Sequence, residues 1–134
     1  MKPENEKDSP LALFEQWAID NKVRFLESEK HVYSREMWIG GILDCLIELD
    51  GKLWLMDIKT GSGIYAEAFY QMSAYDLCFQ EMGAPAVEGY IVVNLPKTGG
   101  IKEKRSISNE DYKLAFRSAL NLYRVGEKIK NTIL

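Results

Sequence analysis

An Asp-Gly pair between two apolar segments constrains the fold of this chain more than any other sequence feature. Asp50-Gly51 separates residues 37–49 (MWIGGILDCLIEL) from residues 52–60 (KLWLMDIKT). Asp-Gly favours a two-residue β-turn, because both turn positions take positive φ. The two segments are therefore predicted to form an antiparallel hairpin in which the numbers of opposing residues add up to about 101. Gly40-Gly41 in the first segment indicates a bulge or a close backbone approach.

Signals on either side of this hairpin predict the remaining elements. Ser9-Pro10 is typical of a helix start, with the serine as N-cap and the proline in the first turn. An extended segment should follow over residues 23–34. Beyond the hairpin, the pattern predicts a helix over about 64–82, a strand over 88–95, a short polar strand or loop over 102–108, and a last helix to about 130. The predicted order is α-β-β-β-α-β-(β)-α, which indicates an α/β fold with a mixed β-sheet flanked by helices.

Composition limits the number of domains and the class of protein. The chain has 134 residues, of which 46% are hydrophobic, so we expect a flexible tail over residues 1–9 and a single domain over residues 10–134. No apolar run approaches the roughly 20 residues that cross a bilayer, so no membrane partner is expected. The N-terminus has no signal-peptide pattern, and Cys45 and Cys78 lack metal-site spacing. A cytoplasmic location is therefore predicted.

Charge is distributed unevenly along the chain. Residues 1–96 carry 8 Lys/Arg and 16 Asp/Glu, whereas residues 97–134 carry 9 Lys/Arg and 4 Asp/Glu. A basic C-terminal third suits local contact with an anion such as a nucleic-acid backbone. The candidate phosphate contacts are Lys97, Lys102, Lys104 and Arg105. A solvated hairpin is the alternative interpretation of this segment.

Two carboxylates are predicted to face each other across the hairpin. Asp57 and Lys59 share one face of their strand, and the hairpin register places Asp44 opposite Asp57. Opposed carboxylates on apolar strands repel each other unless a cation lies between them, and hard oxygen ligands favour Mg²⁺ or Mn²⁺. With Lys59 beside them to stabilise a phosphate, these groups suit phosphodiester hydrolysis. The alternative is an ordinary Asp57–Lys59 ion pair at an exposed strand end, with Asp44 solvated.

The helix after this strand carries polar residues at helical spacing. Glu67, Gln71 and Tyr75 lie four residues apart and share one helix face, which we expect to lie over the carboxyl end of the sheet. A packed amphipathic face is the alternative. Aromatic residues also stand out, and Trp17, Trp38 and Trp54 are interpreted as core or sheet-face residues. Tyr65, Phe69 and Tyr70 are candidates either for stacking on unpaired bases or for the core.

Three motifs occur together in a fixed order: Gly41-x-x-Asp44, Asp57-x-Lys59 and Gln71-x-x-x-Tyr75. In this order and spacing they resemble the PD-(D/E)XK nuclease superfamily. The likeness is to its RecB-type exonucleases, the branch of the mitochondrial genome maintenance exonuclease and its phage and bacterial relatives. The resemblance covers roughly residues 14–80 and implies a restriction-endonuclease-like core.

The resemblance also implies a role for each matching residue. Asp44, Asp57 and Lys59 correspond to the catalytic residues. Asp44 and Asp57 would bind Mg²⁺ or Mn²⁺, and the backbone carbonyl of Ile58 would be a further metal ligand. The supporting residues would be Glu29 on the preceding strand and Gln71 and Tyr75 on the helix.

The implied activity is that of a Mg²⁺- or Mn²⁺-dependent deoxyribonuclease, exonuclease-like on single-stranded or frayed DNA ends. The alternative is a catalytically weak nucleic-acid-binding or accessory subunit on the same fold. RecB-type members usually carry a helical region with a metal ligand before the first strand, and the chain shows no match to it. We therefore also expect a partner protein or further subunit that supplies this region.

Overall fold

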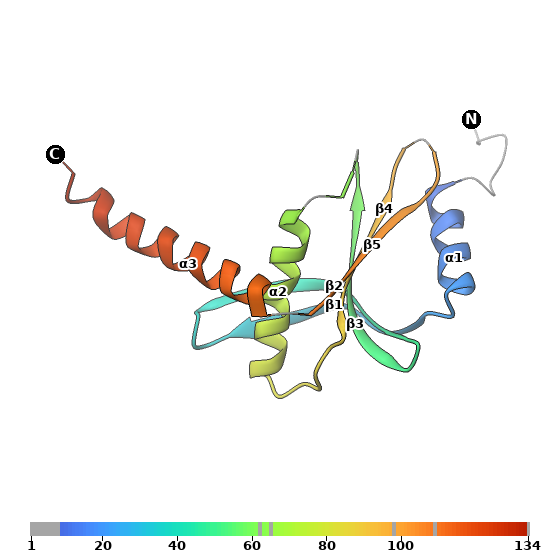
Figure 1. Cartoon of the computed structure of the whole chain (residues 1–134), viewed down its shortest axis with the longest axis horizontal. Helices are drawn as coiled ribbons and strands as arrows, with labels where there is room; N and C mark the ends of the chain where they lie inside the picture. Colours follow the sequence, from blue (N-terminus) through green and yellow to red (C-terminus); the bar gives the residue numbers. More distant parts are fainter. Residues whose placement is uncertain (1–8, 62, 65, 98, 109, 134) are drawn as a thin grey trace.

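The fold is described from a computed structural model that covers residues 9–61, 63–64, 66–97, 99–108 and 110–133. In chain order the elements are α1 (Pro10–Asp20), β1 (Arg24–Ser34), β2 (Ile39–Leu49), β3 (Lys52–Thr60), α2 (Ala66–Glu81), β4 (Gly89–Leu95), β5 (Lys102–Ile107) and α3 (Glu110–Lys130). This is the predicted order, with the short polar segment forming β5 (Figure 1). Ser9 caps α1 as predicted, accepting a hydrogen bond from the Ala12 amide at 3.2 Å. The rest of the predicted tail lies outside the described residues.

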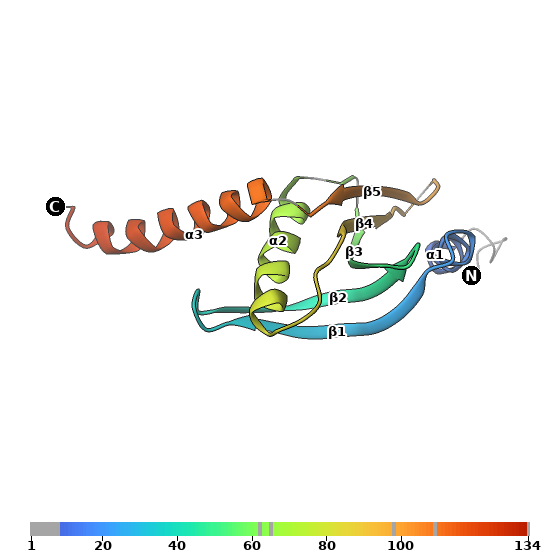
Figure 2. The same ribbon diagram turned by 60° about the horizontal axis from the view of Figure 1, so that its bottom comes forward.

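The five strands form one mixed sheet in the order β1-β2-β3-β4-β5. Every neighbouring pair is antiparallel except β3 and β4, which run parallel because α2 connects them as a crossover. Helix α2 lies over one face of the sheet and α1 over the other (Figures 1 and 2). The predicted α/β class with a mixed sheet flanked by helices is therefore confirmed, and β3 is its central strand.

The register of the β2–β3 hairpin is the one that the Asp-Gly turn predicts. Asp50 and Gly51 have φ values of 52° and 74°, as a type I′ turn requires. Opposing residues run from Leu49 and Lys52 to Cys45 and Met56 without a shift. Asp44 and Asp57 occupy the next position along the two strands.

Each face of the sheet has its own core, because side chains alternate along the strands. Leu55 and Val92 pack with Met72 on the α2 face, whereas Met56 and Ile91 pack on the α1 face. Alternation is broken in β2, where Leu43 and Leu46 both belong to the α2-face core although they are three positions apart, an odd number.

The three tryptophans have different environments. Trp17 and Trp54 are each 8% exposed and pack in the core of the α1 face, as predicted. The prediction that Trp38 belongs to the core or the sheet face is wrong, because this side chain is 82% exposed. The physical reason is that Trp38 lies in the turn between β1 and β2, where its φ is 56°.

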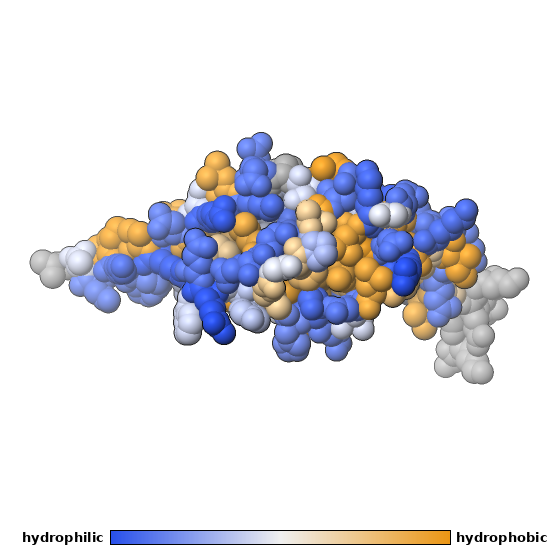
Figure 3. Space-filling model, turned by 90° about the horizontal axis from the view of Figure 1, so that it is seen from below, coloured by the Kyte–Doolittle hydropathy of each residue, from blue (hydrophilic) through white to orange (hydrophobic). Residues whose placement is uncertain are grey.

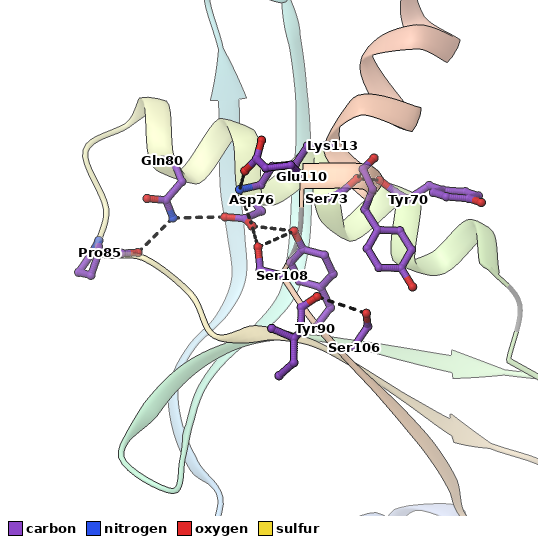
Figure 4. Close-up of polar contacts among 12 residues, drawn as sticks. Tyr70, Ser73, Asp76, Gln80, Pro85, Tyr90, Ser106, Ser108, Glu110 and Lys113 are labelled. Atoms are coloured by element: carbon purple, nitrogen blue, oxygen red, sulfur yellow. Dashed lines mark hydrogen bonds and ion pairs between the residues drawn. The ribbon is translucent and has the colours of Figure 1, made fainter.

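A buried carboxylate fastens the start of α3 to the rest of the fold. Asp76 of α2 is 1% exposed and accepts hydrogen bonds from the Tyr90 hydroxyl at 2.6 Å and from Ser108 Oγ at 2.8 Å (Figure 4). Lys113 Nζ lies 3.6 Å from the same carboxylate. Burial and the hydrogen bond to Asp76 raise the pKa of Tyr90, so its phenol stays protonated as a donor.

Beyond this attachment α3 extends away from the sheet (Figures 1 and 2). None of its described side chains is buried, and Leu122 and Tyr123 are 74% and 67% exposed. Figure 3 shows apolar surface along this helix. No helix within the described ranges is long and apolar enough to cross a membrane.

Candidate active site

Asp44 reaches from β2 to the backbone of β3. Its Oδ2 accepts a hydrogen bond from the Ile58 amide at 2.8 Å, and the residue is half-buried. This contact fixes the Asp44 carboxylate beside Asp57, the neighbour of Ile58 in the chain. The structure therefore brings together the two carboxylates that the hairpin register predicts.

Asp57 is a carboxylate with too few partners for its burial. Its side chain is 8% exposed, and Lys59 Nζ lies 3.1 Å from its Oδ2. Within the described part of the chain, however, Oδ2 has no partner in hydrogen-bonding geometry. Burial, and next the neighbouring Asp44 carboxylate, raise the pKa of Asp57 to about 7, while Lys59 acts in the opposite direction. A cation at this position would favour the charged form.

Lys59 begins a chain of polar contacts that leads to α2. Its Nζ donates to Gln71 Oε1 at 3.5 Å, and Gln71 Nε2 donates to the Tyr75 hydroxyl at 2.9 Å. Burial and the charge of Asp57 raise the pKa of Tyr75, so its phenol stays neutral at physiological pH. The structure thus joins Lys59, Gln71 and Tyr75 in one row beside Asp57.

Gly41 explains how Tyr75 comes so close to the sheet. A Cβ atom on Gly41 would lie 2.5 Å from Tyr75 Cε1, well inside van der Waals contact. The absence of a side chain on β2 therefore provides the space for the tyrosine ring. This is the close backbone approach that Gly40-Gly41 predicts, and it connects the Gly41-x-x-Asp44 motif to α2.

Lys59, Gln71 and Tyr75 line a cleft of about 700 Å³, and Asp57 lies next to it through its contact with Lys59. Glu67, Gln71 and Tyr75 form its α2 wall, as their shared helix face predicts. Ile39, Gly40, Lys59 and Thr60 contribute from the sheet, and Phe116 and Leu120 contribute from α3. The cleft is large enough for a nucleotide-sized ligand.

Two residues that the resemblance assigns to the site, Glu29 and Ile58, make no contact within the described part of the chain that tests their assigned roles. Glu29 lies at the register position across from Asp44, between the pairs Ser28–Cys45 and Lys30–Leu43. Its φ is 51° and its side chain is exposed, with no hydrogen bond or ion pair to either site carboxylate. The Ile58 side chain packs in the α1-face core. A supporting role for Glu29 and a metal-ligand role for the Ile58 carbonyl remain predictions.

The predicted phosphate contacts divide between the two faces of the sheet. Lys104 pairs with Val92 of β4, and Val92 pairs with Asp57 of β3, so Lys104 shares the α2 face with the site. Lys102 pairs with Asn94 on the same face.

Arg105 and Lys97 lie apart from these two lysines. Arg105 is on the α1 face, where it binds Glu103 at 2.8 Å and Asn21 at 3.1 Å. Lys97 is exposed in the turn after β4. Arg105 faces away from Lys102 and Lys104 because side chains alternate along β5.

Asn94 is a site residue that the sequence analysis missed. It is 1% exposed on β4 and pairs with Lys59 of β3. Its Nδ2 donates to the Gly63 carbonyl at 2.9 Å, which holds the segment after β3 in place. The available signal is a single amide near the end of the apolar run YIVVNL, since buried polar groups need a partner.

The donor set fits a hard divalent cation held by few protein ligands. No group of three or more His, Cys, Asp or Glu side chains that could hold a metal occurs among the described residues. Mg²⁺ binds through one or two carboxylates and takes its other ligands from water and substrate phosphates. Asp44 and Asp57 are two carboxylates of this kind, and the Oδ2 atom of Asp57 makes an ion pair with Lys59 but no well-formed hydrogen bond among the described residues.

Comparison with solved structures identifies a similar fold in the crystal structure of SSO0001, with a TM-score of 0.53 and 19% sequence identity. The match covers 87% of this chain and 57% of that chain, so this chain spans just over half the length of SSO0001. At this identity the likeness supports the fold alone. Neither a scan against protein-family models nor a search of curated proteins found a match.

Proposed function

We propose that this protein is a divalent-metal-dependent nuclease with a PD-(D/E)XK core that hydrolyses phosphodiester bonds in DNA, acting like an exonuclease on single-stranded or frayed ends. The observation that carries the proposal is the buried Asp57 carboxylate beside Asp44 and Lys59, whose Oδ2 contacts Lys59 Nζ but has no hydrogen-bonding geometry with any residue that the structure describes. A buried charge of this kind costs free energy unless it serves a ligand.

Asp44 and Asp57 are the residues that would hold Mg²⁺ or Mn²⁺, with the Ile58 carbonyl as a further ligand on the strength of the resemblance. When bound, the ion would supply Lewis-acid activation of water and neutralise charge on the phosphate. The hydrogen bond from the Ile58 amide holds Asp44 in the orientation that this binding needs.

Lys59 acts on the substrate as a positioned positive charge. Asp57 at 3.1 Å and Gln71 at 3.5 Å hold its ammonium group at the cleft. There it can stabilise the negative charge that develops on the phosphate oxygens during hydrolysis.

Tyr75 orients the phosphate by hydrogen bonding. Its oxygen accepts the hydrogen bond from Gln71 Nε2, so its own proton is available to a phosphate oxygen in the cleft. The raised pKa keeps that proton in place at neutral pH.

The test is cleavage of labelled single- and double-stranded DNA with Mg²⁺ or Mn²⁺ and with EDTA. The wild type should cleave single strands or frayed ends, and EDTA should abolish the reaction. Asp57→Asn should lose activity, whereas Asp20→Asn, on the exposed end of α1, should retain it. Full metal-dependent activity in Asp57→Asn would refute the assignment. DNA binding without cleavage would instead indicate the accessory-subunit alternative.

A further inference from the structure

Trp38 is the exposed tryptophan of this chain, and its backbone conformation is unusual. The side chain is 82% exposed, compared with 8% for each of the other two tryptophans. Its φ of 56° lies in the left-handed region, which bulky residues rarely adopt. Such conformations persist where the surroundings enforce them, and they are frequent at ligand sites.

The turn that carries Trp38 is held in place from two sides. From α2, the Glu81 carboxylate accepts hydrogen bonds from Ser34 Oγ at 2.9 Å and from the Arg35 amide at 2.6 Å. Ser34 Oγ in turn accepts from the Met37 amide at 2.9 Å. The indole is therefore presented to solvent by an ordered loop, which lowers the entropy cost of binding a ligand.

From the other side, α3 places a positive charge against the backbone of the turn that carries Trp38. Arg124 donates hydrogen bonds to the carbonyls of Met37 and Trp38. Arg117 and Lys128 lie seven residues before and four residues after Arg124, on the same side of the helix. Both are exposed, and neither forms an ion pair within the described ranges.

The turn also adjoins the candidate active site. Ile39 and Gly40, which follow Trp38 directly, line the same cleft as Lys59 and Gln71. Asp44 lies six positions after Trp38 along the chain, a span of at most about 20 Å. A chain-like ligand bound at the site can therefore continue along the cleft to the indole.

We propose that Trp38 is a stacking platform for a base of single-stranded DNA that extends from the cleft, with the phosphates alongside Arg117, Arg124 and Lys128. An exposed aromatic face next to basic side chains is how proteins bind single strands without sequence preference. The positive charges favour a polyanion over a protein surface as the partner. This inference rests on the proposed nuclease function and specifies its substrate.

The test measures binding in EDTA, where cleavage is absent, using an oligothymidylate and an abasic oligonucleotide of the same length. Because the two other tryptophans are buried, quenching of tryptophan fluorescence by the oligothymidylate reports on Trp38. Trp38→Ala should weaken oligothymidylate binding by roughly 5- to 150-fold, the range for one lost base stack. Trp38→Ala should also lose the preference for oligothymidylate over the abasic strand. Trp38→Phe should retain most of the affinity and most of the preference.

Ile19→Ala is the matched control, because Ile19 is 68% exposed on α1, across the sheet from the cleft. Its binding should equal that of the wild type. Unchanged binding in Trp38→Ala would overturn the inference even if metal-dependent cleavage is intact. Conversely, Trp38→Ala could lose affinity for oligothymidylate but not for the abasic strand, while the wild type cleaves no DNA in Mg²⁺. That result would uphold the stacking site and refute the nuclease. Failure of the wild type to bind single strands would overturn the inference, and a protein partner would become the alternative.

Discussion

At the scale of single residues, Asp57 is the buried carboxylate next to the cleft. The strand that carries it is central and apolar, so the carboxylate loses most of its hydration when the chain folds. Among the described residues its one close cation is Lys59, which is itself 42% exposed and also contacts Gln71. The charged form of Asp57 is therefore undersupplied with partners in the protein alone, which is the condition that a bound divalent cation would relieve.

This imbalance predicts a pH dependence of stability in the metal-free protein. The pKa of Asp57 is about 7 in the folded state, above its ordinary value near 4 in an unfolded chain. As pH rises, the unfolded chain releases this proton first, so the free energy of unfolding should fall between about pH 4 and pH 7. Asp57→Asn cannot ionise and should unfold at higher urea than the wild type at about pH 8 in EDTA, by more than about 1 kcal/mol.

The difference should fall to a few tenths of a kcal/mol at about pH 4, where Asp57 is protonated in the folded state and about half-protonated in the unfolded chain. Added Mg²⁺ should reduce the difference in unfolding free energy between Asp57→Asn and the wild type at about pH 8, because the ion stabilises the wild type alone. Asp20→Asn provides the control for the substitution itself. Equal stability of wild type and Asp57→Asn at about pH 8 would show that the carboxylate is better solvated than its burial indicates.

Lys59 has a different expected signature. If it stabilises the transition state, Lys59→Ala should reduce the cleavage rate at saturating DNA by about 100-fold or more. DNA affinity, measured in Ca²⁺, should change little, because one phosphate contact contributes a small part of binding. The control is Lys52→Ala. Lys52 is an exposed lysine on the same strand as Lys59, and it forms an ion pair with Glu88. An equal loss of affinity and rate would make Lys59 a phosphate clamp only.

At the scale of elements, β2 and α2 are fitted to each other at Gly41 and Tyr75. Gly41→Ala would place a Cβ 2.5 Å from the tyrosine ring, so the ring must leave its position and its hydrogen bond with Gln71. We expect a loss of stability of about 1–3 kcal/mol and a parallel loss of activity. Gly40→Ala is the matched control, because its Cβ would lie 3.4 Å from the nearest atom, in ordinary contact.

A double-mutant cycle measures this fit directly by urea unfolding. In a Tyr75→Ala background Gly41→Ala should cost little, because the ring that it displaces is absent. Additive effects of the two substitutions would show that Gly41 is required for another reason.

The same elements show what the sequence could and could not predict. The Asp50-Gly51 turn fixes the hairpin register locally, so the meeting of Asp44 with Asp57 follows from residue numbers alone. The helical spacing of Gln71 and Tyr75 likewise predicts their shared place in the cleft. Asn94 and Phe116 reach the site through β4 and α3, whose positions depend on tertiary packing such as the Asp76 network. Trp38 is a large apolar side chain next to an apolar strand segment, so the sequence favours its burial. Its exposure follows from its place in the turn between β1 and β2, which only the structure shows.

At the scale of the whole molecule, charge is separated between an acidic body and a basic C-terminal third. The structure places Lys102 and Lys104 on the face of the candidate site and turns Arg105 to the opposite face. Replacing both lysines by alanine should weaken single-stranded DNA binding for all sequences alike and lower the dependence of log affinity on log salt by about 0.7 for each lost phosphate contact.

Arg105→Ala removes one charge from the same strand. It should leave the affinity for single-stranded DNA and its salt dependence unchanged. A salt series of fluorescence binding curves in EDTA distinguishes these cases. If the double lysine variant also binds like the wild type, the DNA path avoids β5 and follows α3 alone.

The central claim is that Asp44 and Asp57 together bind one divalent cation, and the most direct measurement is titration with Mn²⁺, followed by the electron paramagnetic resonance signal of the free ion. The wild type should bind a single Mn²⁺ that excess Mg²⁺ displaces, since both ions prefer carboxylate oxygens. Asp44→Asn and Asp57→Asn should each weaken this binding by about 10-fold or more, a loss of about 1.4 kcal/mol, whereas Asp20→Asn should not. Mn²⁺ binding in Asp57→Asn as tight as in the wild type would contradict the account.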